Sequence, residues 1–412
     1  MKKLNRWIYA AAGVLVLFCA GIIYAWSVLS VPMAAEFPDW TKAQLSLTFT
    51  LAMITFCLGC MAGGFLSKSV DPRIYVLTSA VLFFIGFRVT AGMQSVAMLY
   101  IGFGIVSGFA SGIVYNAVMG TITKWFPDKQ GLISGILLMG FGFSAFAIGK
   151  IYQALTPDTV GAWRSSFRLM SVLIPIVLIV CAPFFVKPET GAEKAASASA
   201  AKKNTDPLAS ELPTGKMIRK GAFWLYYLWA VVLSAAGLAL ISQATGSASE
   251  VGVGIGAGTI ATVVGLISIF NAVGRVLSGM MFDKYGRAVS MNLVNIVFVV
   301  TSGILMLGLT VGSFALIIVG FICGGLAYGA VPPLNSAFVS SRYGQKNYSL
   351  NFSVVNTNLI FASFGSTIAG SLYDAAGSYL STYLLMAALA IVGFLITAAI
   401  SACDRRELKN YK

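Results

Sequence analysis

The chain contains no histidine, the residue most often used for metal binding and for proton transfer near neutral pH. It also has no Walker phosphate-binding motif and no G-x-S-x-G nucleophile elbow. Its six cysteines lie mostly in apolar runs, so we interpret them, including the closely spaced Cys57 and Cys60, as packing residues. These absences argue against a metalloenzyme, an ATP-driven machine and a hydrolase, and they predict a non-enzyme without a cofactor or a bound metal.

Charged residues are also scarce. They make up 10% of the 412 residues, whereas a soluble domain has about 25%. Hydrophobic residues make up 58%, and the mean hydropathy is +0.85. This composition predicts a polytopic membrane protein.

Twelve apolar runs follow one another along the chain. Each is about as long as the roughly 20 residues that cover the hydrocarbon core of a bilayer, so we expect an all-α fold with twelve transmembrane helices. The runs cover residues 8–30, 44–67, 74–93, 96–121, 131–154, 167–186, 222–243, 255–281, 288–309, 313–338, 350–373 and 379–400.

The cations alternate between the two sides of these predicted spans. Most of the 28 Lys and Arg residues fall at the N-terminus, in the loops after even-numbered runs, and at the C-terminus. The positive-inside rule then places both termini in the cytoplasm, and we expect a multi-pass protein of the inner (cytoplasmic) cell membrane. The net charge of +14 then reflects topology and contact with anionic membrane lipid, and nucleic acid is not an expected partner.

Residues 187–220 separate the sixth run from the seventh. They are rich in Ala, Ser, Lys and Pro, a composition that cannot bury a core and predicts a flexible cytoplasmic linker. We therefore expect an N-terminal six-helix bundle over 1–186, this linker, and a C-terminal six-helix bundle over 221–412. The expected assembly is a monomer.

Arg275 is the only charged residue in the sequence between Ile255 and Phe282. A cation at membrane depth costs at least ~2.5 kcal/mol and normally faces a polar cavity or a partner. The next acid along the chain, Asp283, is eight residues away, or about 12 Å on a helix, which is too far for direct pairing. The sequence thus suggests that the anion partner of Arg275 is the cargo. The alternative is that Arg275 snorkels to the headgroups at the cytoplasmic end of its span.

The two halves of the chain resemble each other at a shift of about 215 residues. The stretch GGFLSKSVDPR at 63–73 corresponds to SGMMFDKYGR at 278–287, and GFASGIVYNAVMG at 108–120 corresponds to GGLAYGAVPPLNS at 324–336. Each half thereby places a tyrosine, Tyr115 or Tyr328, in the cytoplasmic half of a glycine-rich span. Halves of equal orientation predict a substrate site near the membrane midplane between them. We expect both tyrosines to line it, and simple packing is the alternative.

Three stretches resemble a known family. The second-half loop resembles the loop signature of the major facilitator superfamily, through Gly274, Arg275, Gly279, Asp283, Lys284, Gly286 and Arg287. The stretches NRWIYAAAGVLVLFCAGIIYAWSVLSVP at 5–32 and KWFPDKQGLISG at 124–135 resemble its oxalate/formate antiporter family, which is related to monocarboxylate transporters. The resemblance covers nearly the whole chain. It implies that Arg275 contacts a substrate carboxylate and that Tyr24 lines the cavity.

The chain departs from the family pattern in two places. A lysine that dicarboxylate exchangers of this family carry in span 11 is missing from the stretch NYSLNFSVVNTNLIFAS at 347–363, which weakens the case for dicarboxylate binding. The first-half loop has Ser67 where an aspartate is usual and Val70 where a glycine is usual.

Other polar and aromatic residues are further candidates for substrate contact. Asn116 follows Tyr115 and so points about 100° further around the helix. Phe352 and Asn356 lie in the eleventh run, where core packing and helix–helix hydrogen bonds are the alternatives.

Four loop charges are candidates for gating. Asp283 and Arg287 in the second half, with Asp71 and Arg73 in the first, are expected to form charge contacts that close the inner side in the outward-facing state. The alternative is that these are solvated loop charges.

These observations together predict a secondary transporter of small organic anions, most simply monocarboxylates of the lactate, pyruvate and formate class. None of the fourteen acids lies deep in a predicted span, which favours exchange or uniport. Proton symport stays open, because a proton can travel with the carboxylate. The alternatives are an oxalate/formate-type dicarboxylate exchanger, a non-transporting anion receptor, and a carrier of amphipathic or cationic compounds.

Overall fold

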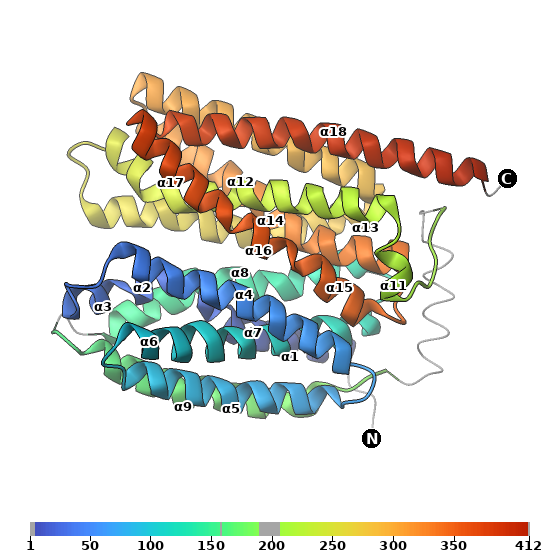
Figure 1. The fold of residues 1–412 in the computed structure, drawn as a ribbon, viewed down its shortest axis with the longest axis horizontal. Helices are drawn as coiled ribbons and strands as arrows, with labels where there is room; N and C mark the ends of the chain where they lie inside the picture. The colour runs from blue at the N-terminus through green and yellow to red at the C-terminus, as the bar shows by residue number, and fades with distance from the viewer. Residues whose placement is uncertain (1–4, 157–158, 189–206, 411–412) are drawn as a thin grey trace. The chain divides into compact units, whose positions relative to one another are not determined.

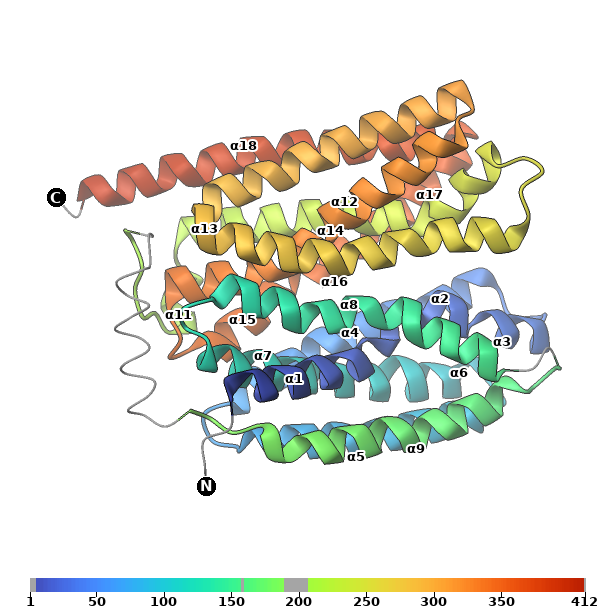
Figure 2. The ribbon, with the colours of Figure 1, turned by 180° about the vertical axis from the view of Figure 1, so that it is seen from behind.

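The computed structural model describes residues 5–156, 159–188 and 207–410. Within these ranges, eleven helices are long and apolar enough to cross a membrane. One of them, α13 (Ala257–Val311), turns back on itself at Gly286, as Figure 2 shows. The φ of Gly286 is 76°, in the left-handed region that favours glycine. The all-α, multi-spanning fold is confirmed, and this bend accounts for the difference between eleven helices and twelve apolar runs.

The first compact unit comprises Met1–Asp128, Ile136–Ala201 and Phe352–Asn356. In it α5 packs along α9, and α4 packs along α7 (Figure 1). Its helical segments are α1 (Arg6–Ala20), η1 (Gly21–Ala25), α2 (Trp26–Leu29), α3 (Val31–Glu36), α4 (Lys42–Leu66), α5 (Pro72–Ala91), α6 (Val96–Leu99), η2 (Tyr100–Ser107), α7 (Gly108–Ile122), η3 (Thr123–Trp125), most of α8 (Gln130–Leu155), α9 (Trp163–Cys181) and η4 (Ala182–Phe184).

The second compact unit comprises Lys129–Gly135, Lys202–Asn351 and Thr357–Lys412. The division thus runs through α8 and through α15 (Tyr348–Asn356). The two arms of α13 pack extensively against α14. The other helices of this unit are α11 (Thr214–Met217), α12 (Gly221–Val251), α14 (Phe314–Tyr343), α16 (Asn358–Ala362), α17 (Phe364–Ala376) and α18 (Leu380–Asn410).

Side chains fix where several helices begin. The Asn5 side chain accepts the N–H of Trp7 at the start of α1. A capping box formed by Thr41 and Gln44 starts α4, with both reciprocal hydrogen bonds present. At α5 the Asp71 carboxylate caps the helix, and Pro72 occupies the first helical position, where a missing N–H costs nothing.

The last part of the expected linker is structured. Residues 207–220 belong to the second unit, and the Glu211 carboxylate accepts the backbone N–H groups of Gln345 and Lys346, at 3.0 and 2.9 Å. The expectation of flexibility overlooked that an acid in the linker can cap the start of a helix, here the turn that leads into α15. Residues 189–206 lie outside the described part of the chain.

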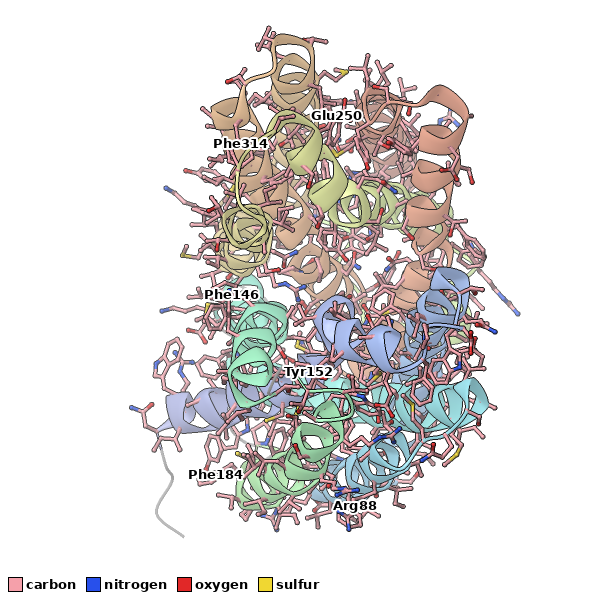
Figure 3. All side chains as sticks on the ribbon, turned by 90° about the vertical axis from the view of Figure 1, so that its left-hand side faces the viewer. Arg88, Phe146, Tyr152, Phe184, Glu250 and Phe314 are labelled. Atoms are coloured by element: carbon pink, nitrogen blue, oxygen red, sulfur yellow. The ribbon has the colours of Figure 1, made fainter. Side chains whose placement is uncertain are left out.

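Figure 3 labels two residues of the first unit that differ in burial, Tyr152 and Arg88. Tyr152 is buried, and its hydroxyl donates to the carbonyl of Leu29 at 3.3 Å. Arg88 lies at the rim, exposed, with its guanidinium 5.8 Å from the ring centroid of Phe84. Arg88 lies in the last turn of α5, where a long basic side chain can reach past the end of its helix.

Candidate functional site

Arg275 lies within the first arm of α13 and is only 3% exposed. Its Nε donates a hydrogen bond to Oδ1 of Asn271 at 2.8 Å. Asn271 is one helical turn earlier, on the same face, because residues four apart are neighbours on a helix. The bond therefore directs the side chain away from the Gly286 bend and into the span, opposite to the direction of snorkelling at that end.

Glycines allow other helices to approach the backbone at Arg275. A Cβ on Gly135 would lie 2.3 Å from the carbonyl oxygen of Arg275, and a Cβ on Gly131 would lie 2.1 Å from the carbonyl oxygen of Gly279. Gly131 and Gly135 are four residues apart at the start of α8, in the small-xxx-small spacing that lets two helices touch. The stretch KWFPDKQGLISG thus contains the contact face for the arginine-bearing helix.

Tyr328 on α14 is 2% exposed, and its ring lies against Gly237 of α12. A Cβ on Gly237 would lie 2.1 Å from a ring carbon, so only glycine leaves room for this ring position. Pro332 and Pro333 follow within α14. Because proline has no N–H, they remove helical hydrogen bonds to the carbonyls of residues 328 and 329 and favour a local bend.

In the first unit an aromatic cluster surrounds Tyr115, which is 4% exposed. Its ring centroid lies 5.0 Å from Phe56 and 5.2 Å from Phe141, in edge-to-face geometry. On another side it stacks on Phe352, with centroids 5.9 Å apart and planes 13° apart. Sequence reasoning expected Tyr115 and Phe352 as separate candidates, and the structure brings them together.

Tyr24 joins this cluster through Phe141, at a centroid distance of 5.3 Å. It lies on η1, a 3₁₀ segment that interrupts the first span. At the preceding turn the Ser111 hydroxyl donates to the carbonyl of Ala20 at 2.8 Å. A 3₁₀ stretch inside a helix often marks a hinge or a strained functional segment.

Asn356 ends α15, where the eleventh run breaks before α16. It is 2% exposed, and its backbone carbonyl accepts from the Cys57 thiol at 3.5 Å. Among the residues that the structure describes, its side-chain Nδ2 has no hydrogen-bond partner. A buried donor in this state is uncommon and calls for an explanation. Asn116 is also buried, at 1% exposure, and its Cβ lies close to Gly63 of α4.

Each of the four gating candidates makes a hydrogen bond or an ion pair in the structure. The Asp283 carboxylate accepts the N–H groups of Gly131 and Leu132, at 2.7 and 2.8 Å, in the first turn of α8. Arg287 forms an ion pair with Asp404 of α18. Asp71 accepts the N–H of Arg73 at 2.8 Å as the cap of α5. Charge contacts between the halves, as expected from the sequence, stay a prediction.

Three residues near the candidates escaped sequence reasoning. Phe56 and Phe141 carry no signal beyond being aromatic in an apolar run, and such residues are common in cores. Asn271 does carry one, because an Asn four residues before a membrane arginine predicts a hydrogen bond along the helix.

Two of the known proteins that are similar to this chain are transporters of carboxylates by name. The oxalate:formate antiporter of Oxalobacter formigenes is 26% identical over 98% of the chain and 94% of its own length. Monocarboxylate transporter 13 of Rattus norvegicus is 22% identical over 90% of the chain and 83% of its own length.

Solved structures share the fold. The proton:xylose symporter XylE superposes with a TM-score of 0.73 over 96% of both chains at 14% identity. The E. coli fucose:proton symporter FucP gives 0.64 over 95% of this chain and 99% of its own, also at 14% identity. The model of the Major Facilitator Superfamily matches residues 11–359 and 253–412, and the chain therefore belongs to this family of membrane transporters.

Proposed function

We propose that the protein is a secondary transporter of small monocarboxylates that works by alternating access. Arg275 carries the proposal, because its guanidinium is buried in a span and is held by a bond that points into that span. The planar fork of a guanidinium matches a carboxylate with two parallel hydrogen bonds. An arginine that served only as a headgroup anchor would extend toward the end of its helix.

The substrate class follows from charge. Arg275 is the cation that the sequence places in this span, and the eleventh run supplies no lysine. A dianion would therefore leave a second carboxylate to be desolvated without a cation of its own, which is costly. A dicarboxylate exchanger is the second candidate, since the Oxalobacter relative is named for oxalate and formate.

Neutral donors and rings complete the proposed site. The hydroxyl groups of Tyr115, Tyr328 and Tyr24 would donate hydrogen bonds to the substrate. Phe352 would shape the surface around Tyr115, on whose ring it stacks. Asn356 gains support from its buried Nδ2, because an anionic ligand would supply the acceptor that the described residues do not. Asn116 belongs to the same proposal on its burial beside Tyr115.

Alternating access needs contacts that form and break. Asp283 is the best supported gating residue, since its carboxylate binds the first turn of α8 through two backbone N–H groups. A carboxylate at a helix N-terminus is stabilised by the helix dipole. Arg287, Asp71 and Arg73 are proposed to contribute to gating through the same loops.

We place the transporter in the inner (cytoplasmic) membrane as a monomer with both termini inside, following the distribution of cations. Exchange or uniport is the proposed mode. A co-transported proton is compatible with it if the proton rides on the substrate carboxylate.

Transport by purified protein in liposomes tests the proposal. Vesicles would be loaded with formate, pyruvate, lactate or oxalate, and uptake of the same radiolabelled anion would be measured. We expect uptake of monocarboxylates, and Arg275→Ala and Arg275→Lys should weaken apparent affinity at least ~100-fold. Arg88→Ala is the matched control, because that arginine is exposed at the rim. Near-normal uptake by Arg275→Ala, or uptake of oxalate that no monocarboxylate inhibits, would refute the proposal.

A further inference from the structure

The position of Asn271 is fixed both through its side chain and through its backbone. Its side chain is 5% exposed and accepts the Nε–H of Arg275 at 2.8 Å. Its backbone is pressed against α14, where a Cβ on Gly329 would lie 2.1 Å from the Asn271 carbonyl oxygen and a Cβ on Gly325 would lie 3.1 Å from its nitrogen. The two glycines are one turn apart on α14. They allow a close helix contact that fixes the position from which the amide reaches the guanidinium.

The chemistry of the acceptor matters as much as its position. An aspartate at the same position has almost the same shape and would also accept the Nε–H. A carboxylate would in addition form an ion pair with the guanidinium and cancel much of its field in a medium of low dielectric constant. An amide oxygen holds the same N–H without adding negative charge.

We infer that Asn271 is a positioning and selectivity residue, whose neutral amide orients the Arg275 guanidinium while leaving its charge to attract an anion. This inference rests on the proposed function, because it assigns the arginine to substrate binding. It explains why the helix carries an amide rather than an acid one turn before a membrane arginine.

Two substitutions separate orientation from charge. Asn271→Ala removes the hydrogen bond and keeps the site cationic. Asn271→Asp keeps the hydrogen bond and neutralises the site, with Asn271→Glu as a second acidic variant should the first not fold. Asn295, a buried asparagine on the second arm of α13 that bonds to Trp229 and Thr397, supplies the control variants Asn295→Ala and Asn295→Asp.

Two quantities would be measured for each variant: inhibition of [¹⁴C]pyruvate uptake by unlabelled pyruvate in liposomes, and the midpoint of thermal unfolding in detergent. We expect Asn271→Ala to weaken apparent affinity about 10-fold, from the loss of one bond to a charged group. Asn271→Asp should weaken it at least ~10-fold further, although its unfolding midpoint is equal to or above that of the Ala variant. The order of affinity is then opposite to the order of stability.

A merely structural role predicts the same order for both quantities, because Asp preserves the bond and Ala does not. Affinity in Asn271→Asp that equals or exceeds that of Asn271→Ala would therefore overturn the inference. The control pair at Asn295 should change stability and leave affinity within about twofold. If Arg275→Ala takes up pyruvate normally, or if the wild type takes up none of the four carboxylates, the proposed function fails and this inference fails with it.

Discussion

Replacing Asn356 by leucine should make the protein more stable and its substrate binding weaker. The Nδ2 atom of Asn356 is buried without a hydrogen-bond partner among the described residues, in a side chain that is 2% exposed. A buried donor without a partner costs about 1–3 kcal/mol, and an apolar side chain of similar size avoids that cost. The ligand-free protein should therefore gain about 1–3 kcal/mol, less any strain from the branched side chain.

Binding should change in the opposite direction. If an anionic substrate accepts the Asn356 N–H, loss of that bond should weaken affinity by about 1.5–3 kcal/mol, or roughly 10-fold or more. Thermal unfolding without substrate and inhibition of uptake by unlabelled monocarboxylate measure the two effects.

Asn295→Leu is the matched control. Its side chain accepts from Trp229 at 2.9 Å and donates to Thr397 at 3.3 Å, so its replacement should destabilise the protein and leave affinity unchanged. The reasoning is refuted if Asn356→Leu behaves in the same way, since its amide would then be a structural group.

Three further predictions test the site and its surroundings. Tyr115→Phe and Tyr328→Phe should each weaken substrate affinity by about 0.5–1.5 kcal/mol, and the two losses should not be additive in a double-mutant cycle. Strict additivity, or no loss in either single mutant, would show that these tyrosines are packing residues outside the site. Asp283→Asn should lower the free energy of unfolding by about 1 kcal/mol, because it removes a negative charge from the N-terminus of α8. The maximal uptake rate should change more than the apparent affinity. No change in stability or in uptake rate would contradict the capping role. Gly135→Ala should impair uptake severely, since its Cβ would lie 2.3 Å from a backbone carbonyl of α13, whereas Gly149→Ala on the same helix has 3.5 Å of room and should be tolerated; equal behaviour of the two would refute the close-contact argument.

The spans were predictable because the bilayer imposes a long, uniform apolar signal on each of them. The apolar runs at 255–281 and 288–309 gave both arms of α13, and the charged loop between them marked the turn. The sequence predicted a loop between the two runs, whereas the helix continues through these residues to the bend at Gly286. A positive φ at one glycine allows this sharp turn, and the sequence alone does not reveal the φ of a glycine.

The end of the linker and the neighbours of Arg275 were harder to predict for a different reason. The composition of 187–220 predicts a segment without a core of its own, but it does not show that Glu211 can cap backbone groups more than 130 residues away. Phe141 lies at the centre of the aromatic cluster because α7, α8 and η1 meet there, and such meetings depend on packing rather than on local pattern. The sequence singles out Arg275 as a candidate because a cation in a membrane span is costly wherever its partner lies.

The balance of charge in the proposed site follows from what a transporter must do. A substrate has to leave the site as well as enter it. The site must therefore bind an anion, but less tightly than a site with two buried cations would. In the proposed site Arg275 would supply one charge, held in place by the Asn271 amide, and the Asn356 amide and the phenol groups would add neutral bonds worth less each. None of the fourteen acids lies deep in a predicted span. A monoanion is the ligand whose charge this arrangement matches. The affinity for oxalate relative to that for formate therefore separates the proposed function most directly from a dicarboxylate exchanger.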